Sequence, residues 1–140
     1  MKSLHNEFNL NDMTNEQKQM SKSRIVCGWI LAGLLGAMFV MAGTTKLIGG
    51  KEMAENFARY GLEGRQWLIG SGELLSAIIF LIPRTSSFGV LLLSSLMGGA
   101  IVTHMEHGEM FIAQSVILVI IWITGWLRNP ELFASFTKKY

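Results

Sequence analysis

Two histidines and two glutamates lie close together in the stretch IVTHMEHGEM, residues 101–110. His104 and His107 are three residues apart, as are Glu106 and Glu109, so each pair would share one face of a helix. Imidazole and carboxylate groups at this spacing can bind a metal ion or move protons. The zinc signature HEXXH needs histidines four residues apart and does not occur here. Without further fixed ligands, two neighbouring histidines do not predict a metal site.

The composition indicates what surrounds these polar groups. The chain has 140 residues, of which 50% are hydrophobic and only 16% are charged. A soluble helical bundle of this length would need a more charged surface, so lipid is the expected solvent. Four apolar runs near the roughly 20 residues that cross a bilayer predict an all-α integral membrane four-helix bundle. The predicted helices span residues 25–48, 67–82, 87–105 and 110–127.

The chain on either side of residues 24–128, which hold the four predicted helices, is polar. Residues 1–23 predict a flexible cytoplasmic tail, because a secretory signal would place its apolar core soon after a short basic start. Residues 129–140 predict a cytoplasmic C-terminal tail. Cys27 is the only cysteine, which excludes a disulfide within the chain.

The distribution of lysine and arginine predicts the orientation in the membrane. Eight basic residues lie on the side of the two termini and of the connection between the second and third helices, against at most four on the other side. Both termini should therefore be cytoplasmic, in a cell (inner or plasma) membrane. The first outer connection, KEMAENFARYG at residues 51–61, predicts a short amphipathic helix on the outer surface, with an exposed loop as the alternative.

With this topology, the four helices each bring a polar side chain to a similar depth on the outer side. These residues are Lys46, Glu73, Thr103 with His104, and Gln114. A charge at membrane depth is costly and is kept by pairing or by function, so we predict an ion pair between Lys46 and Glu73. His104 and Gln114 are expected to complete its hydrogen bonds and to form an outward-facing polar pocket. A purely structural polar clasp is the alternative.

The rest of the opening stretch is expected to be a solvated outer turn. Gly108 should begin this turn, because glycine commonly follows the end of a helix. His107, Glu106 and Glu109 would then carry little chemistry. The predicted site therefore lies across the bundle rather than along the stretch.

Several short motifs, in their order and spacing, resemble the DoxX-like family of membrane proteins. They are Gly43-Thr-Thr-Lys46-Leu47, Glu55-x-Phe57-x-x-Tyr60-Gly61, Ile69-Gly-Ser-Gly-Glu73, Arg84 and Thr103-His104-x-x-x-Gly108-Glu109. The resemblance covers roughly residues 25–128 and implies a four-helix integral membrane protein. The family's lysine and glutamate correspond to Lys46 and Glu73, and its adjacent threonine and histidine correspond to Thr103 and His104. The resemblance assigns no catalytic role to these residues.

The relatives implied by this resemblance include the membrane subunit of a thiosulfate:quinone oxidoreductase and proteins of oxidoreductase complexes in oxidative-stress defence. We therefore predict the membrane subunit of a quinone-linked redox complex. Quinone is the ligand that this resemblance implies. No haem, flavin or iron–sulfur motif occurs, so electrons would come from a redox protein partner or a soluble reductant. The alternatives are a non-enzymatic scaffold or assembly factor and a small-solute permease.

The sequence contains no self-contained catalytic motif, so catalytic residues are not assigned and an enzymatic activity is left open. The lipid bilayer is the expected partner, and no nucleic-acid partner is expected. A homo-oligomer is left open.

Overall fold

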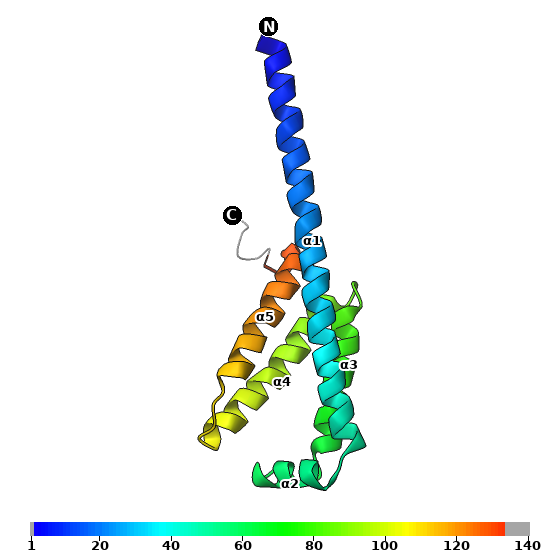
Figure 1. Ribbon diagram of the computed structural model, residues 1–140, viewed down its shortest axis with the longest axis vertical. Coiled ribbons are helices and arrows are strands. Elements are labelled where there is room, and N and C mark those ends of the chain that lie inside the picture. Colours follow the sequence, from blue (N-terminus) through cyan, green and yellow to red (C-terminus); the bar gives the residue numbers. More distant parts are fainter. Residues whose placement is uncertain (1, 134–140) are drawn as a thin grey trace.

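The computed structural model describes the backbone of residues 2–133 and the side chains of residues 22–132. Over this range the chain forms helices and no strand, which confirms the all-α prediction. The elements are α1 (Lys2–Ile48), α2 (Lys51–Arg59), α3 (Gln66–Leu81), α4 (Ser86–Glu106), α5 (Ile112–Arg128) and the short 3-10 helix η1 (Pro130–Phe133). α1 packs against α3 and α5, and α4 packs against the same two helices, while α2 lies across one end (Figure 1).

The first helix is longer than predicted. α1 ends at Ile48, as expected, but it begins at Lys2, so residues 2–23 are helical where a flexible tail is predicted. This segment contains neither glycine nor proline, and nothing in its backbone stops the helix from continuing. Figure 1 shows this N-terminal part projecting beyond the other helices. The bounds of α3, α4 and α5 differ from the predicted ones by at most two residues at each end.

The core lies between α1, α3, α4 and α5, while their outer faces are also apolar. The buried hydrophobic residues are Ala32, Leu35, Phe39, Ala77, Phe80, Val90, Leu93, Met97 and Ile121. Large apolar side chains such as Leu34, Leu75 and Val119 are more than half exposed. An apolar outer surface of this kind is typical of a protein whose solvent is lipid.

Two helices are long and apolar enough to cross a membrane, namely residues Lys22–Ile48 of α1 and α4. Only 28% and 22% of their apolar windows are buried inside the molecule, so they do not resemble the buried core helices of a soluble protein. α3 and α5 are apolar but shorter. The 16 residues of α3 extend about 24 Å, which is less than a typical hydrocarbon core.

Glycines follow α1, α2 and α4 where these helices end, at the end of the molecule where α2 lies, and Gly49 after α1 has φ 68°. Gly61 after α2 has φ 65° and Gly108 after α4 has φ 68°, a conformation that glycine adopts without strain. After α4, the backbone N–H of Glu109 donates to the carbonyl oxygen of His104 at 2.9 Å. This is the long bond of a Schellman motif, and it folds the chain back over the last helical turn. It therefore brings Glu109 close to His104.

At the opposite end, Arg128 joins three helices. Its Nη1 donates to the carbonyl oxygen of Phe80 at 2.7 Å, and its Nη2 to that of Leu81 at 3.2 Å. These carbonyl groups belong to the last turn of α3 and have no partner within a regular helix. The guanidinium also lies 4.3 Å from the ring centre of Trp29 on α1. Arg128 thus caps α3 from α5, whereas the sequence assigns it only a role in orientation.

The predicted C-terminal tail begins with ordered structure. Pro130–Phe133 form η1, and Leu132 packs against the hydrophobic core. The start of residues 129–140 is therefore part of the packed domain rather than a separate tail. Residues 134–140 lie outside the described range.

Candidate functional site

The backbones of α1 and α3 nearly touch where the candidate site begins. A Cβ atom added to Gly43 would lie 2.8 Å from the carbonyl oxygen of Gly70, and one added to Gly70 would lie 2.9 Å from that of Gly43. These distances leave room only for glycine at both positions. Such a close approach is typical of helices that pack inside a membrane. It brings Lys46, one turn after Gly43, within reach of Glu73.

Lys46 and Glu73, which are predicted to pair, form an ion pair in the structure. Lys46 Nζ donates to Glu73 Oε2 at 2.8 Å and also lies 3.3 Å from the carbonyl oxygen of Ala42. The side chains are 19% and 9% exposed, so both charges are largely shielded from solvent. Shielded charges of this kind are tolerated when each has a partner of opposite sign.

A cavity of about 400 Å³ lies beside this ion pair and takes residues from all five α-helices. The five residues predicted for a polar pocket all line it: Lys46, Glu73, Thr103, His104 and Gln114. Helix α2 adds Phe57, the residue directly after it adds Tyr60, and the rest of the wall is mostly apolar or glycine. A mainly apolar cavity with a few convergent polar groups is typical of small-molecule sites. Ligand binding in this cavity stays a prediction.

Two of these residues do not have the predicted partners. His104 and Gln114 are expected to complete the hydrogen bonds of the ion pair, and this expectation is wrong. His104 Nδ1 instead lies 2.8 Å from Glu109 Oε2. Gln114 Oε1 is buried and has no hydrogen-bond partner. The physical reason is that Lys46 finds its second acceptor in its own helix, at Ala42.

Glu109 is predicted to be a solvated turn residue with little chemistry, and this prediction is also wrong. Its Oε2 accepts a hydrogen bond from the hydroxyl of Tyr60 at 2.7 Å, in addition to the contact with His104. Its Oε1 lies 3.6 Å from Nη2 of Arg59. Glu109 therefore links α2 to the end of α4. The sequence signal for this link is the glycine after each helix, which turns the chain back toward the neighbouring helix end.

The two other charged or titratable residues of the opening stretch lie in the solvent, as predicted. Glu106 and His107 are both exposed, and His107 Nδ1 lies 2.8 Å from the carbonyl oxygen of Thr103. The His107 ring also packs edge-on against Tyr60, with 5.1 Å between ring centres. Across the side chains at residues 22–132, no group of three or more His, Cys, Asp or Glu residues could hold a metal ion.

The contact between Tyr60 and Glu109 shifts the pKa of both groups. The hydrogen bond from Tyr60 is the largest cause that lowers the pKa of Glu109 below 4.5, with smaller contributions from His104 and Arg59. The same hydrogen bond raises the pKa of Tyr60 above 10.0, because the phenol must keep its proton to donate it. The folded state therefore favours an ionised Glu109 beside a neutral Tyr60.

These shifts predict a pH window for the stabilising effect of the Tyr60–Glu109 contact. Because the pKa of Glu109 is lowered, its contribution is complete above 4.5 and is lost as the pH falls through the lowered pKa. Because the pKa of Tyr60 is raised, its contribution is complete below 10.0 and is lost as the pH rises through the raised pKa. The difference in melting temperature between wild type and Tyr60→Phe should therefore vanish at low pH and at high pH.

Thermal unfolding followed by tryptophan fluorescence across this pH range measures that difference. Glu106→Gln is the matched control, because Glu106 is an exposed glutamate in the same stretch. It should leave the melting temperature close to wild type throughout. A difference for Tyr60→Phe that is constant at every pH would contradict the prediction.

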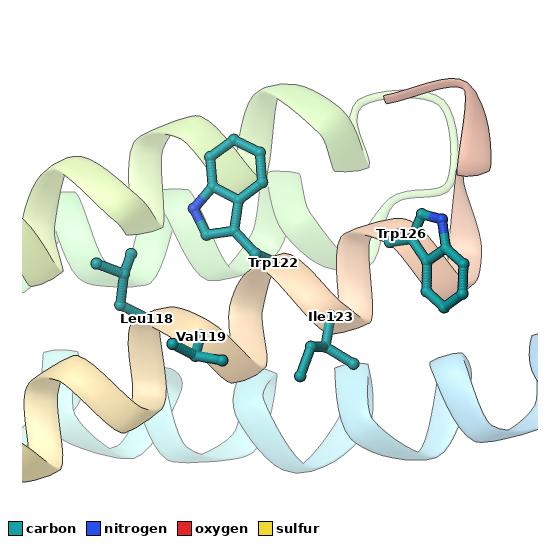
Figure 2. Close-up of a pocket in the computed structure, with 5 residues that line it drawn as sticks. All are labelled: Leu118, Val119, Trp122, Ile123 and Trp126. Atoms are coloured by element: carbon teal, nitrogen blue, oxygen red, sulfur yellow. The ribbon is translucent and has the colours of Figure 1, made fainter. Parts of the chain in front are cut away.

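A second cavity, of about 570 Å³, lies along α5 and has a different character. Figure 2 shows its five lining side chains, which are Leu118, Val119, Trp122, Ile123 and Trp126. None of them carries a titratable or nucleophilic group. An apolar lining of this kind can accept a lipid chain but cannot move protons. The candidate functional site is therefore the smaller cavity beside Lys46 and Glu73.

Comparison with known proteins adds one match. A family model described as the DoxX-like family matches residues 30–124, which is more than half of the chain. The matched segment contains the ion pair, the cavity residues and Glu109. No curated protein and no solved structure matches the chain.

Proposed function

The chain belongs to the DoxX-like family, and on this premise we propose that it is the membrane subunit of a quinone-linked redox complex. In this proposal α1, α3, α4 and α5 form a four-helix bundle that spans a cell (inner or plasma) membrane. Both termini are cytoplasmic, and α2 lies as an amphipathic helix at the outer surface. The partners are the bilayer and a redox protein that exchanges electrons with the quinone.

Two observations support this arrangement in the membrane. The excess of lysine and arginine lies on the side of the termini, where cytoplasmic segments normally carry positive charge. Figure 1 shows α2 and the connection between α4 and α5 at the end of the molecule opposite η1. α2 buries Phe57 against the rest of the molecule and exposes its charged residues, as expected for a helix at a polar boundary.

The main support for the quinone proposal is the buried side chain of Gln114. Its Oε1 is a buried polar atom without a partner, and such atoms are rare unless a ligand or water completes them. Gln114 lines a cavity whose volume of about 400 Å³ fits a quinone head group and whose wall is mainly apolar. The polar side chains that would hold the head group are Gln114, His104 and Thr103.

A quinone in this cavity would supply the transfer of two electrons together with two protons. The chain itself would bind the head group, shield it from water and exchange hydrogen bonds with its oxygens. Glu73 and Lys46 would set the electrostatic environment in the part of the cavity that they line. Electrons would enter or leave through the partner protein.

Titration calorimetry in lipid nanodiscs with a short-chain benzoquinone and its quinol tests this function. Wild type should bind at least one of the two forms, and Gln114→Leu should weaken that binding about tenfold, as expected for the loss of one hydrogen bond. Gln114→Leu should not lower the free energy of unfolding, because Oε1 bonds to no other residue. Ser115→Ala is the matched control, since Ser115 bonds to the backbone of Phe111 and lies outside the cavity. Wild type that binds neither form would refute the quinone function.

The ion pair also supports a second candidate function, a structural role without catalysis. The ion pair between Lys46 and Glu73 is complete within the chain, as expected of a clasp that only holds α1 to α3. A non-enzymatic scaffold or assembly factor would need nothing more. In that case wild type would bind neither quinone nor quinol, and Gln114→Leu would change neither stability nor any partner interaction.

A further inference from the structure

Glu109 keeps a hydrogen on Nδ1 of His104. A carboxylate oxygen only accepts hydrogen bonds, so His104 Nδ1 must carry the hydrogen in its 2.8 Å contact with Glu109 Oε2. The same oxygen accepts the hydroxyl hydrogen of Tyr60 at 2.7 Å. Arg59 lies 3.6 Å from the other oxygen, so the carboxylate is held from both sides. The lowered pKa of Glu109 keeps it ionised at neutral pH.

This contact also determines whether the other ring nitrogen of His104, Nε2, carries a hydrogen. When Nδ1 of a neutral imidazole carries the hydrogen, Nε2 is an acceptor. Carboxylates fix histidine tautomers in this way beside metal ions and in catalytic sites. His104 lines the cavity, so its acceptor is the nitrogen that remains for a ligand there.

The other polar groups around the cavity include both acceptors and donors, since the amide of Gln114 also carries N–H groups and Ser95 adds a hydroxyl. Thr103 Oγ1 donates its hydrogen to the carbonyl oxygen of Gly99 at 2.9 Å, which leaves the hydroxyl an acceptor. Gln114 Oε1 is an acceptor without a partner. Lys46 directs its ammonium group to Glu73 and Ala42. His104 Nε2, which Glu109 leaves as an acceptor, therefore calls for a ligand with a hydroxyl donor.

We propose that Glu109 is a positioning residue that fixes His104 as the Nδ1–H tautomer and thereby makes the cavity select the quinol form over the quinone form. A quinol has O–H donors, one of which matches His104 Nε2, whereas a quinone has only acceptor oxygens and leaves that nitrogen unpaired. The amide of Gln114 can bond to either form, through Oε1 or Nε2. An unpaired buried polar group costs more than a hydrogen bond gains, so the preference should be large. This inference rests on the proposed quinone function.

Nitrogen NMR of isotope-labelled histidine in nanodiscs tests the tautomer without any ligand. At about pH 8 an ordinary imidazole is neutral, and the His104 signal, identified by its loss in His104→Gln, should report an unprotonated Nε2. Glu109→Gln should allow the other tautomer, and Glu106→Gln should leave the wild-type spectrum unchanged. A protonated Nε2 in wild type, or an unchanged spectrum in Glu109→Gln, would overturn the inference whether or not quinone binds.

Binding of a short-chain benzoquinone and its quinol to the same proteins tests the consequence. Wild type should prefer the quinol at least tenfold, and Glu109→Gln should lose most of this preference by weakening quinol binding alone. Tyr60→Phe removes the hydrogen bond from Tyr60 to Glu109 but keeps the carboxylate beside His104, so the preference should persist. Equal weakening of both forms in Glu109→Gln would overturn the positioning role while leaving the quinone function intact. Loss of the preference in Tyr60→Phe would show that docking of α2, rather than the tautomer, sets the specificity.

Discussion

Replacing Glu73 by leucine is expected to lower the free energy of unfolding by about 3 kcal/mol, the usual cost of removing one partner of a buried ion pair. Lys46 would lose the carboxylate that now lies 2.8 Å from its ammonium group. Its side chain is only 19% exposed, so water cannot fully replace that partner. The remaining contact with the carbonyl oxygen of Ala42, at 3.3 Å, is too long to compensate.

The double variant Lys46→Met/Glu73→Leu should recover most of this loss. Apolar side chains of similar volume often replace a buried ion pair at little cost, because neither charge then has to be kept away from water. Unfolding in mixed detergent micelles, measured for wild type, both single variants and the double variant, gives the coupling energy between the two residues. A double variant as unstable as Glu73→Leu alone would contradict the expectation.

Arg59→Met provides the contrast for an exposed pair. Arg59 lies 3.6 Å from Glu109, and the two side chains are 70% and 31% exposed. Exposed ion pairs contribute little because water screens the two charges, so this variant should change stability much less than Glu73→Leu. Equal effects would mean that the environment of the Lys46–Glu73 pair is not as shielded as its geometry indicates.

The ion pair and the cavity illustrate what the sequence can predict. Antiparallel helices that alternate in direction place residues near the ends of consecutive apolar runs at the same level. Lys46, Glu73, His104 and Gln114 could therefore be assigned to one region from their positions alone, and the structure places all four around one cavity. Charges are so costly at this depth that their pairing follows from elementary electrostatics.

Hydrogen bonds between side chains in the loops that follow the helices could not be predicted in the same way. The contact of Tyr60 with Glu109 depends on how two glycine turns fold back, and Tyr60 and Glu109 are 49 positions apart in the sequence. A rotation of either turn by a small angle would separate the two side chains. A polar composition does not by itself exclude a helix, and residues 2–23, which contain neither glycine nor proline, form the start of α1.

The hydrogen-bond partners of Arg128 could not be predicted from the sequence either. An arginine beside an apolar helix predicts the side of the membrane, but not which backbone groups it binds. Its bonds to Phe80 and Leu81 require that the end of α3 and the end of α5 lie side by side. That arrangement depends in part on how closely α3 and α4 pack, and Gly89 permits a close approach of the two helices.

Gly89→Ala is expected to destabilise the protein by about 2 kcal/mol, within the range for overpacked cores. A Cβ atom at position 89 would lie 2.3 Å from Cα and 2.5 Å from the backbone nitrogen of Phe80. These are backbone atoms of α3, so the overlap can be relieved only by moving α3 away from α4. The higher helix propensity of alanine, which favours the variant by about 1 kcal/mol, is too small to offset this.

Gly98→Ala on the same helix is the matched control for this effect. No atom outside its own helix lies within 4 Å of a Cβ added at Gly98, so this variant gains helix propensity without a clash. It should be as stable as wild type or more stable by up to about 1 kcal/mol. Separation of α3 from α4 in Gly89→Ala should also increase amide hydrogen exchange in the last turn of α3, where Arg128 binds Phe80. Equal stability and exchange in the two variants would show that the contact between Gly89 and Phe80 does not hold α3 and α4 together.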